Sequence, residues 1–249
     1  MNKITIITAV YNCNNTISDT IESILSQDYV NIELIVVDGG STDGTLNKLN
    51  HYRNQIDVLI TEPDLGIYDA LNKGLKSATG DIIGFLHADD LYFDKGVLTK
   101  IVNAFSDTCV DVVYGDLLYV GNESTADVVR YWRSGTFHNE QLKYGWMPPH
   151  PTLYLRRSIY EKFGGFNIKY SISADYDFML RILLNNSLRF FYISDVLVRM
   201  RIGGISNRSL SNIFQKSVED LRIIRHHKVG SFFTLFCKNF RKLNQFLSR

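Results

Sequence analysis

Cysteine is scarce in this sequence. Cys13, Cys109 and Cys237 are the three cysteines among 249 residues, and no two of them have the Cys-x-x-Cys spacing. An odd number of scattered thiols argues against both a disulfide framework and the common zinc-ligand patterns. We therefore expect these cysteines to be reduced and either buried or inert.

Long hydrophobic runs are also missing. The densest apolar stretch, residues 232–237, is far shorter than the ~20 residues that cross a bilayer as a helix. The first residues lead directly into a strand pattern and contain no signal-peptide cleavage region. These two absences predict a cytoplasmic protein.

Acidic residues are missing from the end of the chain. Residues 221–249 contain seven lysines and arginines and no aspartate or glutamate, whereas residues 1–220 contain 20 basic and 26 acidic residues. The basic tail therefore predicts a negatively charged partner, although the net charge of the whole chain is only +1. Nucleic acid is not favoured, because the rest of the chain is acidic and has no recognisable binding module.

The tail, residues 211–249, is also rich in phenylalanine, with Phe232, Phe233, Phe236, Phe240 and Phe246. A basic, aromatic-rich amphipathic helix can lie on an anionic membrane surface. We expect it to contact the inner face of the cytoplasmic membrane. The alternative is a helix that packs on the rest of the protein with its charges in solvent.

Apolar runs and helical patterns alternate along the first 90 residues. Strands are predicted at 4–10, 32–37, 57–61 and 81–86, and helices from Thr16 through Leu25, after the Gly39–Gly44 turn, and at 67–78. This alternation is typical of βαβ units and predicts a mostly parallel, twisted sheet.

The pattern becomes less regular after Asp90. A strand is predicted at 110–114, shorter antiparallel strands at 117–120 and 128–132, and helices at 156–163 and 175–185. Residues 144–151 contain three of the four prolines. They predict an irregular loop over the site.

Three carboxylates follow predicted strands. Asp38 ends the second strand, and Asp89 and Asp90 come soon after the fourth. Open parallel sheets bind ligands at this edge. Neighbouring carboxylates repel each other, so a shared Mg²⁺ or Mn²⁺ that also binds phosphates is their natural counter-charge. A solvated acidic turn is the alternative.

Five segments occur in the order in which family 2 glycosyltransferases of the GT-A fold show them. They are residues 8–12 (TAVYN), 37–45 (VDGGSTDGT), 66–74 (GIYDALNKG), 80–90 (GDIIGFLHADD) and 174–177 (ADYD). The resemblance covers roughly residues 3–205. Single segments are weak signals, but five in register are specific.

The resemblance implies an α/β fold of the GT-A type. This fold has a Rossmann-like, mostly parallel sheet with helices on both faces, and we expect a small antiparallel acceptor-side region and a helical C-terminal tail beside it. We expect one domain at residues 1–210, with a nucleotide-binding half at about 1–110 and an acceptor-side half at about 111–210. The tail at 211–249 would follow it.

The resemblance also implies donor contacts. In the family, the loop after the first strand holds the base of the donor, which corresponds here to Thr8, Ala9, Val10 and Tyr11; a tyrosine ring can stack on a flat base. Asp38 can accept a hydrogen bond from the base or ribose, or it can form an Asx-turn, and one carboxylate can do both.

Asp69 and Lys73 lie four residues apart on one predicted helix. An ordinary ion pair between them is the default explanation. The corresponding helix of the family approaches the nucleotide, which implies nucleotide-binding roles for both residues.

His87, Ala88 and Asp89 stand where the family carries its Asp-x-Asp metal motif. By resemblance Asp89 is the main ligand of Mn²⁺ or Mg²⁺, and Asp90 assists at the metal or the nucleotide. The histidine departs from the motif, and imidazole suits Mn²⁺ or a softer ion better than Mg²⁺. His87 either contacts the ribose or closes the turn.

Asp175 matches the second position of the family's Glu-Asp motif, whose carboxylate deprotonates the acceptor hydroxyl. Ala174 replaces the usual acid before it. Asp177 is a reserve base or acceptor contact, or a partner of the helix dipole. His150, between prolines, contacts acceptor or phosphate, or packs in a lid. The late loop 201–206 lacks the metal-binding histidine that relatives frequently have.

The resemblance implies an inverting, metal-dependent enzyme. It would transfer a hexose from a nucleotide-sugar, most simply a UDP-sugar, to a lipid-linked glycan acceptor in the synthesis of a surface polysaccharide or O-antigen. His87 and Ala174 leave a non-catalytic sugar-binding or assembly protein as the alternative. A nucleotidyltransferase is disfavoured, because residues 11–15 contain neither glycine nor lysine.

Overall fold

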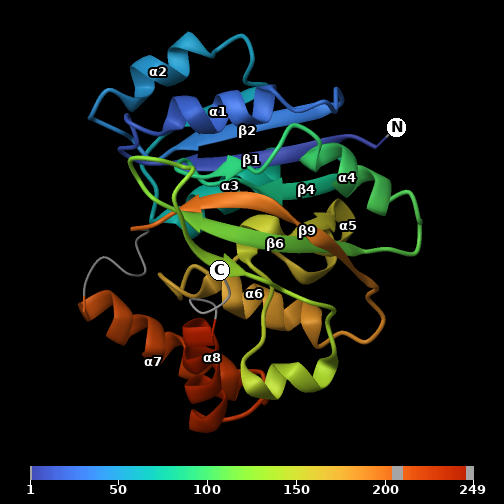
Figure 1. Ribbon diagram of the computed structural model, residues 1–249. Coiled ribbons are helices and arrows are strands. Elements are labelled where there is room, and N and C mark those ends of the chain that lie inside the picture. The colour runs from blue at the N-terminus through green and yellow to red at the C-terminus, as the bar shows by residue number, and fades with distance from the viewer. Residues whose placement is uncertain (1, 204–209, 245–249) are drawn as a thin grey trace.

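The structure is a computed structural model, and it describes residues 2–203 and 210–244. One sheet runs through these residues, in the order β3-β2-β1-β4-β8-β6-β9-β5, with β7 paired to β6 (Figure 1). The strands are β1 (Ile4–Val10), β2 (Ile32–Asp38), β3 (Val58–Thr61), β4 (Ile82–Phe85), β5 (Leu91–Tyr92), β6 (Val112–Val120), β7 (Val128–Trp132), β8 (Tyr154–Arg156) and β9 (Phe190–Arg201).

Helices connect and cover the strands. They are α1 (Ile17–Leu25), α2 (Thr45–His51), α3 (Ile67–Ser77), α4 (Val97–Ala104), α5 (Arg157–Phe163), α6 (Ala174–Leu183), α7 (Leu210–His226) and α8 (Phe232–Asn244), with short 3₁₀ helices η1 (Asn139–Tyr144) and η2 (His150–Thr152). None of those within 2–203 and 210–244 is long and apolar enough to cross a membrane.

The strands β3, β2, β1 and β4 are parallel, as predicted. The side chains of β2, β1 and β4 are buried on both faces and alternate between two cores, whereas the edge strand β3 is only partly buried. Ile4 and Ile6 pack with α1, α2 and α4 on one face, whereas Ile7 and Ala9 pack with α3, α5 and α6 on the other. Helices therefore cover both faces of the sheet.

The second half of the sheet is mixed. β8 runs antiparallel to β4 and β6, and β6 runs parallel to β9. The prediction of separate strands at 110–114 and 117–120 is wrong, since β6 is continuous. Register shifts near Gly115 absorb the irregularity, and a Cβ at Gly115 would lie 2.6 Å from the Leu197 side chain on β9. Glycine therefore permits the close approach of β6 and β9.

The segment 144–151 is irregular apart from its 3₁₀ turns, but it is packed rather than loose. Trp146, Pro148, Pro149 and His150 are buried. The indole of Trp146 donates to the backbone oxygen of Ser134 at 3.0 Å. The predicted irregular segment is therefore confirmed and is packed against the protein, whereas its position over the site stays a prediction.

The C-terminal region forms two helices, α7 and α8, which pack beside α6 and η1 at one end of the molecule (Figure 1). The chain turns between them at Lys228, whose φ is 56°. The predicted tail residue Phe246, with the rest of 245–249, lies outside the described residues, as do residues 204–206 of the late loop.

Candidate active site

The strands β1 and β4 separate at the edge where the predicted residues gather. β1 pairs with β2 as far as Val10 and Asp38, but it pairs with β4 only as far as Ile7 and Phe85. The connections after β1 and β3 lead to opposite sides of β1, so this is a topological switch point. Ligands of open α/β sheets bind in the crevice at such a point.

The predicted donor residues follow β1 to its end. Thr8, Ala9 and Val10 are buried at the end of the strand, whereas Tyr11 is 60% exposed in the following loop. The exposed ring is available to a flat partner. The structure brings these residues to the switch point, and their contact with a nucleotide stays a prediction.

Asp38 is fully buried, and its carboxylate forms the turn after β2. It accepts hydrogen bonds from the backbone N–H groups of Gly40, at 3.1 Å, and Ser41, at 3.2 Å. The neighbouring loop is tied to the same turn, because the N–H of Thr42 donates to the Asn12 side chain at 2.9 Å. The Asp38 carboxylate therefore forms the predicted Asx-turn. A hydrogen bond between Asp38 and a ligand stays a prediction.

Asp69 and Lys73 form the expected pair on α3, with Nζ and Oδ2 3.5 Å apart. Lys73 is also 2.9 Å from Glu62 and donates to the backbone oxygen of Pro63. The hydrogen bond with Glu62 raises the pKa of Lys73 above its ordinary value. The pair thus ties α3 to the loop after β3, and its nucleotide-binding role is untested.

Asp90 is a buried acid at the site. Its side chain is 0% exposed, and among the described residues neither carboxylate oxygen has a hydrogen-bond partner. Burial raises the pKa of Asp90 well above its usual range, and the neighbouring Asp89 adds to this effect, while Arg201 opposes it. A carboxylate in this environment requires a positive charge to ionise.

Arg201 is a site residue that the sequence reasoning did not single out. It lies at the end of β9 and is 6% exposed. Its guanidinium donates to the backbone oxygen of Asp89 at 3.0 Å and to the Asp19 carboxylate at 2.6 Å. Arg201 therefore fixes the turn that carries the predicted metal ligand.

His87 lies between the predicted metal ligand Asp89 and the predicted base Asp175. Burial lowers the pKa of its imidazole, whereas the charges of Asp89 and Asp175 both act to raise it. The His87 ring lies 5.6 Å from the ring of His150, which lies 5.5 Å from Phe166, and Phe166 lies 5.5 Å from Tyr68. Because the Tyr68 hydroxyl is 3.1 Å from Asp175, a short chain of contacts joins the predicted base to the turn that carries Asp89.

Asp175 is on the first turn of α6 and is held by two donors. Oδ1 accepts from the Tyr68 hydroxyl at 3.1 Å and from the backbone N–H of Tyr176 at 2.8 Å. The Tyr68 hydroxyl also donates to the backbone oxygen of Ile172 at 2.7 Å. A side chain of α3 thus orients the predicted base.

His150 is 7% exposed and stacks on Phe85, with ring centroids 5.4 Å apart. Its ring centroid is 5.6 Å from that of His87. Burial lowers the pKa of His150 to about 4, so the imidazole is neutral at pH 7. His150 is therefore packed among the rings beside the site, which is the second of its two predicted roles. A contact of His150 with acceptor or phosphate stays a prediction.

Asp177 has partners within the chain. It is 4% exposed and lies 2.9 Å from Nε2 of His227, the residue after α7, and 3.2 Å from the Arg181 guanidinium. Burial alone would raise the pKa of Asp177, but these partners outweigh it and lower the pKa. The carboxylate therefore joins α6 to α7, and this pairing competes with the proposed contact to acceptor or phosphate.

Tyr119 on β6 and Arg130 on β7 are paired across the strands beside Arg201, since the next residue, Val120, pairs with Arg201 on β9. Burial raises the pKa of Tyr119, Arg130 opposes this, and the charges of Asp90 and Asp175 add to it. The Arg130 guanidinium lies 4.0 Å from the centroid of the Tyr119 ring. The sequence pattern gave no signal that would assign this cation–aromatic pair to the site, because strand pairing creates it.

The residues at the β4 end suit a divalent cation. Within the described chain no three His, Cys, Asp or Glu side chains gather as a metal site. Mg²⁺ and Mn²⁺ need fewer protein ligands, since phosphate and water oxygens complete their coordination. The unsatisfied buried carboxylate of Asp90, with Asp89 beside it, therefore fits such an ion.

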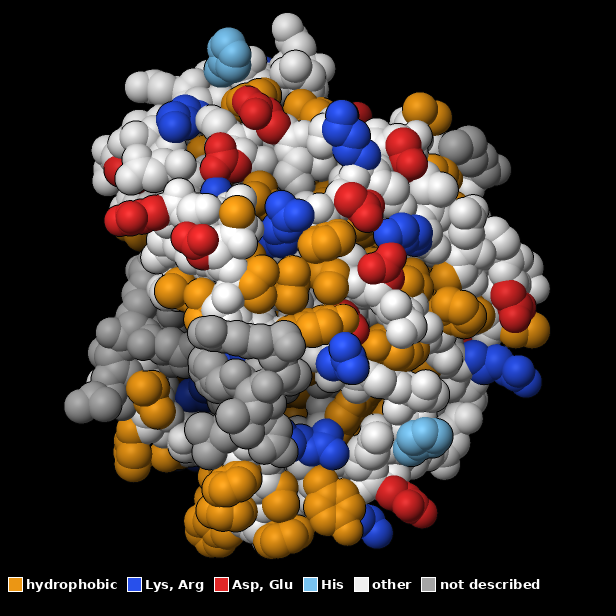
Figure 2. Space-filling view, viewed as in Figure 1, with side chains coloured by type: hydrophobic (Ala, Val, Ile, Leu, Met, Phe, Trp, Pro, Cys, Tyr) orange, Lys and Arg blue, Asp and Glu red, His pale blue; other side chains and the backbone are white. Residues whose placement is uncertain are grey.

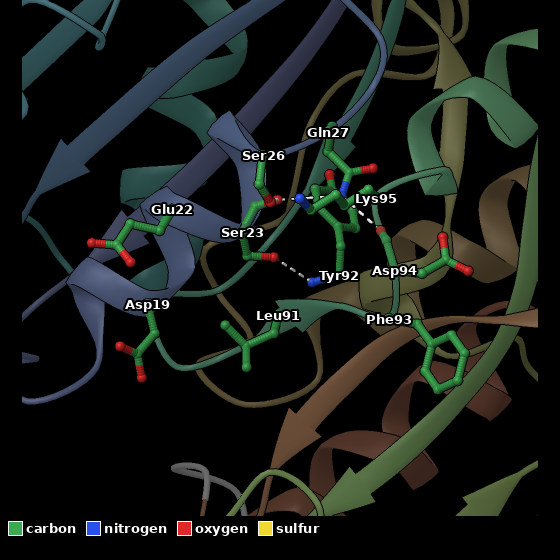
Figure 3. Close-up of a pocket in the computed structure, with 10 residues that line it drawn as sticks. All are labelled: Asp19, Glu22, Ser23, Ser26, Gln27, Leu91, Tyr92, Phe93, Asp94 and Lys95. Atoms are coloured by element: carbon green, nitrogen blue, oxygen red, sulfur yellow. Dashed lines mark hydrogen bonds between the residues drawn. The ribbon is translucent and has the colours of Figure 1, made fainter.

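A pocket between α1 and β5 adjoins this cluster through Asp19, the partner of Arg201 (Figure 3). Polar groups that line this pocket are hydrogen-bonded to one another. The Ser23 hydroxyl accepts from the Tyr92 N–H at 2.7 Å, and the Gln27 amide donates to the backbone oxygen of Asp94 at 2.8 Å. The pocket contains none of the predicted site residues, and we assign the site to the β1–β4 edge instead.

A family model and two named glycosyltransferases match this sequence. The family model "Glycosyl transferase family 2" matches residues 5–165. A PGL/p-HBAD biosynthesis glycosyltransferase of Mycobacterium tuberculosis is 31% identical over 201 residues, which cover 79% of this chain and 76% of the relative. The Escherichia coli UDP-Glc:alpha-D-GlcNAc-diphosphoundecaprenol beta-1,3-glucosyltransferase WfaP is 30% identical over 236 residues, 92% of this chain and 90% of the relative.

Solved structures share the fold. TarS 1–349 of S. aureus in complex with UDP-GlcNAc has a TM-score of 0.71 at 21% identity, and the match covers 91% of this chain and 66% of that chain. The mannosyltransferase PcManGT of Pyrobaculum calidifontis, in complex with GDP-Man and Mn²⁺, has a TM-score of 0.67 at 20% identity and covers 99% and 73%. With this GT-A architecture and the match over residues 5–165, the chain belongs to glycosyl transferase family 2.

Proposed function

We propose that this glycosyltransferase is a metal-dependent, inverting enzyme that transfers a hexose from a UDP-sugar to a lipid-linked glycan acceptor. The observation that carries the proposal is the chain of contacts from Asp175, on α6, through Tyr68, Phe166 and His150 to His87, in the turn after β4 that also carries Asp89. Asp89 is suited to the diphosphate side of a bound donor, and Asp175 is suited to the acceptor side.

The chemistry is a single displacement. The acceptor hydroxyl oxygen forms a bond to the anomeric carbon, the bond from that carbon to the diphosphate breaks, and UDP leaves with the electron pair. Asp175 takes the hydroxyl proton. Attack opposite the leaving group inverts the anomeric configuration.

Asp89 and Asp90 would hold the divalent ion, which offsets the charge that develops on the diphosphate. The donor and acceptor classes are supported by the relatives. WfaP is named for UDP-Glc and a diphosphoundecaprenol-linked GlcNAc, and the TarS structure contains UDP-GlcNAc. These substrates belong to those proteins, and for this chain they define the panel to be tested.

The exposed face of α8 supports a lipid-linked acceptor. Phe232, Phe233, Phe236 and Phe240 are each more than half exposed, and Figure 2 shows hydrophobic side chains gathered at the end of the molecule where α7 and α8 lie. The chain after Asp220 has no acid. We propose that this face, the phenylalanine face, lies on an anionic membrane.

The test is a transfer assay with UDP-hexoses, Mn²⁺ and a polyprenyl-diphosphate-linked sugar. We expect a product whose anomeric configuration, measured by NMR, is opposite to that of the donor. Retention of configuration would contradict the single displacement. UDP binding without transfer or donor hydrolysis across the whole panel would favour a non-catalytic sugar-binding protein.

A further inference from the structure

The segment before α6 is bound by one side chain from the C-terminal region. Glu219, on α7, accepts hydrogen bonds from the backbone N–H groups of Ser171 at 3.2 Å, Ile172 at 3.0 Å and Ser173 at 2.9 Å. It also accepts from the Ser171 hydroxyl at 3.0 Å. Glu219 is 5% exposed. Residues 171–173 are thus held by a carboxylate more than 40 positions along the chain.

These contacts are of a strong kind. Bonds from N–H groups to a carboxylate are charge-assisted, and the buried position of Glu219 reduces competition with water. Ser173, the residue before α6, makes no capping bond with its own side chain among the described residues. Glu219 therefore supplies the acceptor at this end of α6, where a negative charge is also favoured by the helix dipole.

The same segment is held from the other side by α3. The single proton of the Tyr68 hydroxyl is shared between the backbone oxygen of Ile172 and the Asp175 carboxylate. The N–H of Ile172 is bound by Glu219 and its C=O by Tyr68. With both backbone groups fixed, the position of Asp175 three residues later depends on α3 and α7 together.

We infer that Glu219 is a positioning residue for the transfer reaction. It acts through Asp175 by fixing residues 171–173, and it touches neither substrate. A base must lie within hydrogen-bond reach of the attacking hydroxyl. A displacement of about 1 Å at a reacting group can cost on the order of 10²-fold in rate.

The inference rests on the proposed role of Asp175 as base, but it adds a function for the C-terminal helices. The family match ends at residue 165, before both Asp175 and Glu219. α7 and α8 are also fixed to each other by the ion pair between Lys238 and Asp220, at 2.8 Å. Through Glu219, α7 therefore takes part in holding the acceptor side of the site.

The test compares Glu219→Gln with the full-length wild-type enzyme. Glutamine keeps the size of the side chain but replaces one acceptor oxygen by an NH₂ donor that faces the N–H groups of the segment. We expect kcat to fall by roughly 10- to 100-fold, while the KM for donor and the affinity for UDP stay the same. Hydrogen exchange at the amides of 171–173 should become faster.

A double-mutant comparison separates this inference from the proposed function. If Glu219 acts through Asp175, Glu219→Gln should cause little further loss in an Asp175→Asn background. An equal loss in both backgrounds would overturn the positioning role and leave the base intact. Full activity of Asp175→Asn alone would instead refute the base, and the positioning role with it.

Two further variants control for folding. Thr234→Val removes the hydrogen bond from Thr234 to the backbone oxygen of Lys143, which loosens α8 without touching residues 171–173, and it should leave kcat within about twofold. Ser171→Ala removes a single bond to Glu219 and should give a smaller fall in kcat if Glu219→Gln does not fold. An unchanged kcat in both Ser171→Ala and a folded Glu219→Gln would overturn the inference.

Discussion

The donor side and the acceptor side of the site are held together by different kinds of contact. On the donor side, Asp38 binds the next turn of the chain, and Asn12 binds a loop 30 residues away. On the acceptor side, Asp175 depends on Tyr68, 107 residues earlier, and on Glu219 through residues 171–173. The donor side therefore combines short turns with the long-range contact of Arg201 with Asp89, whereas the acceptor side requires α3, α6 and α7 to be assembled first.

This difference predicts that substitutions on the two sides separate binding from chemistry. Asp175→Asn should have the largest effect, because amide cannot take the proton of the acceptor hydroxyl. We expect kcat to fall by about 10²- to 10⁴-fold, with UDP affinity unchanged in calorimetry. A parallel loss of UDP binding would place Asp175 on the donor side instead.

Asp89→Asn should affect the donor side. Loss of the carboxylate weakens the hold on a divalent ion, so UDP affinity in the presence of Mn²⁺ should fall roughly 100-fold, or about 2.7 kcal/mol. Asp94→Asn is the matched control, since Asp94 pairs with Lys100 at the surface. Equal UDP affinities for the wild type and Asp89→Asn, with and without Mn²⁺, would exclude a metal-mediated role.

Gly84→Ala tests the strand that joins the two sides. A Cβ at Gly84 on β4 would lie 2.1 Å from the fully buried Tyr154 ring on β8. We expect a loss of unfolding free energy of about 2 to 3 kcal/mol from overpacking, measured by urea denaturation. Gly96→Ala is the control, because its nearest atom would be at 3.5 Å. Equal stability of the two variants would contradict this packing.

Glu33 lies near the start of β2, at the other end of the strand from Asp38. Burial acts to raise its pKa, but hydrogen bonds from Lys3, Thr5 and Thr79 outweigh burial and lower the pKa to about 2. Because this lies below the ordinary 4.5, the contribution to stability is present above pH 4.5 and is lost as the pH falls toward 2.

Glu33→Gln should therefore cost about 1 to 2 kcal/mol at pH 7, and the difference from the wild type should shrink between pH 4.5 and 2. Melting curves across this range measure it. The exposed Glu161, which lies 3.6 Å from Arg157, provides Glu161→Gln as a control with little change. A difference that is constant with pH would show that the charge of Glu33 is not involved.

Phe236→Ser tests the membrane contact of the acceptor side. Loss of one exposed ring from the phenylalanine face should weaken binding to vesicles that contain anionic lipid by roughly fivefold, or about 1 kcal/mol. Sedimentation with vesicles measures it. Val30→Ser, an exposed apolar residue outside α7 and α8, is the control. Vesicle binding that is the same for both variants and the wild type would argue that this face does not meet lipid.

The sequence was most informative about the donor side. The four parallel strands, their connecting helices and the carboxylates at their ends are readable because apolar runs, glycine turns and acids follow one another within a few residues. The register that separates β1 from β4 after Ile7 is set by pairing. It is therefore visible only in the structure.

The acceptor side was less predictable for a physical reason. β9 was not predicted, although its partly alternating pattern gave a signal, and its parallel partner β6 lies some 70 residues earlier. Glu219 is a single charged residue whose role depends on long-range packing, as is Arg201 on the donor side. No local pattern distinguishes them from solvated charges.

The contacts of α7 have a consequence for protein engineering. Because Glu219 and His227 bind residues of the segment and helix that carry Asp175, the C-terminal region cannot be exchanged as an independent module. A chimera joined near residue 210 would combine a foreign end with a catalytic segment that lacks its acceptors. Such a hybrid would require the glutamate, and the helix that presents it, to be transplanted back.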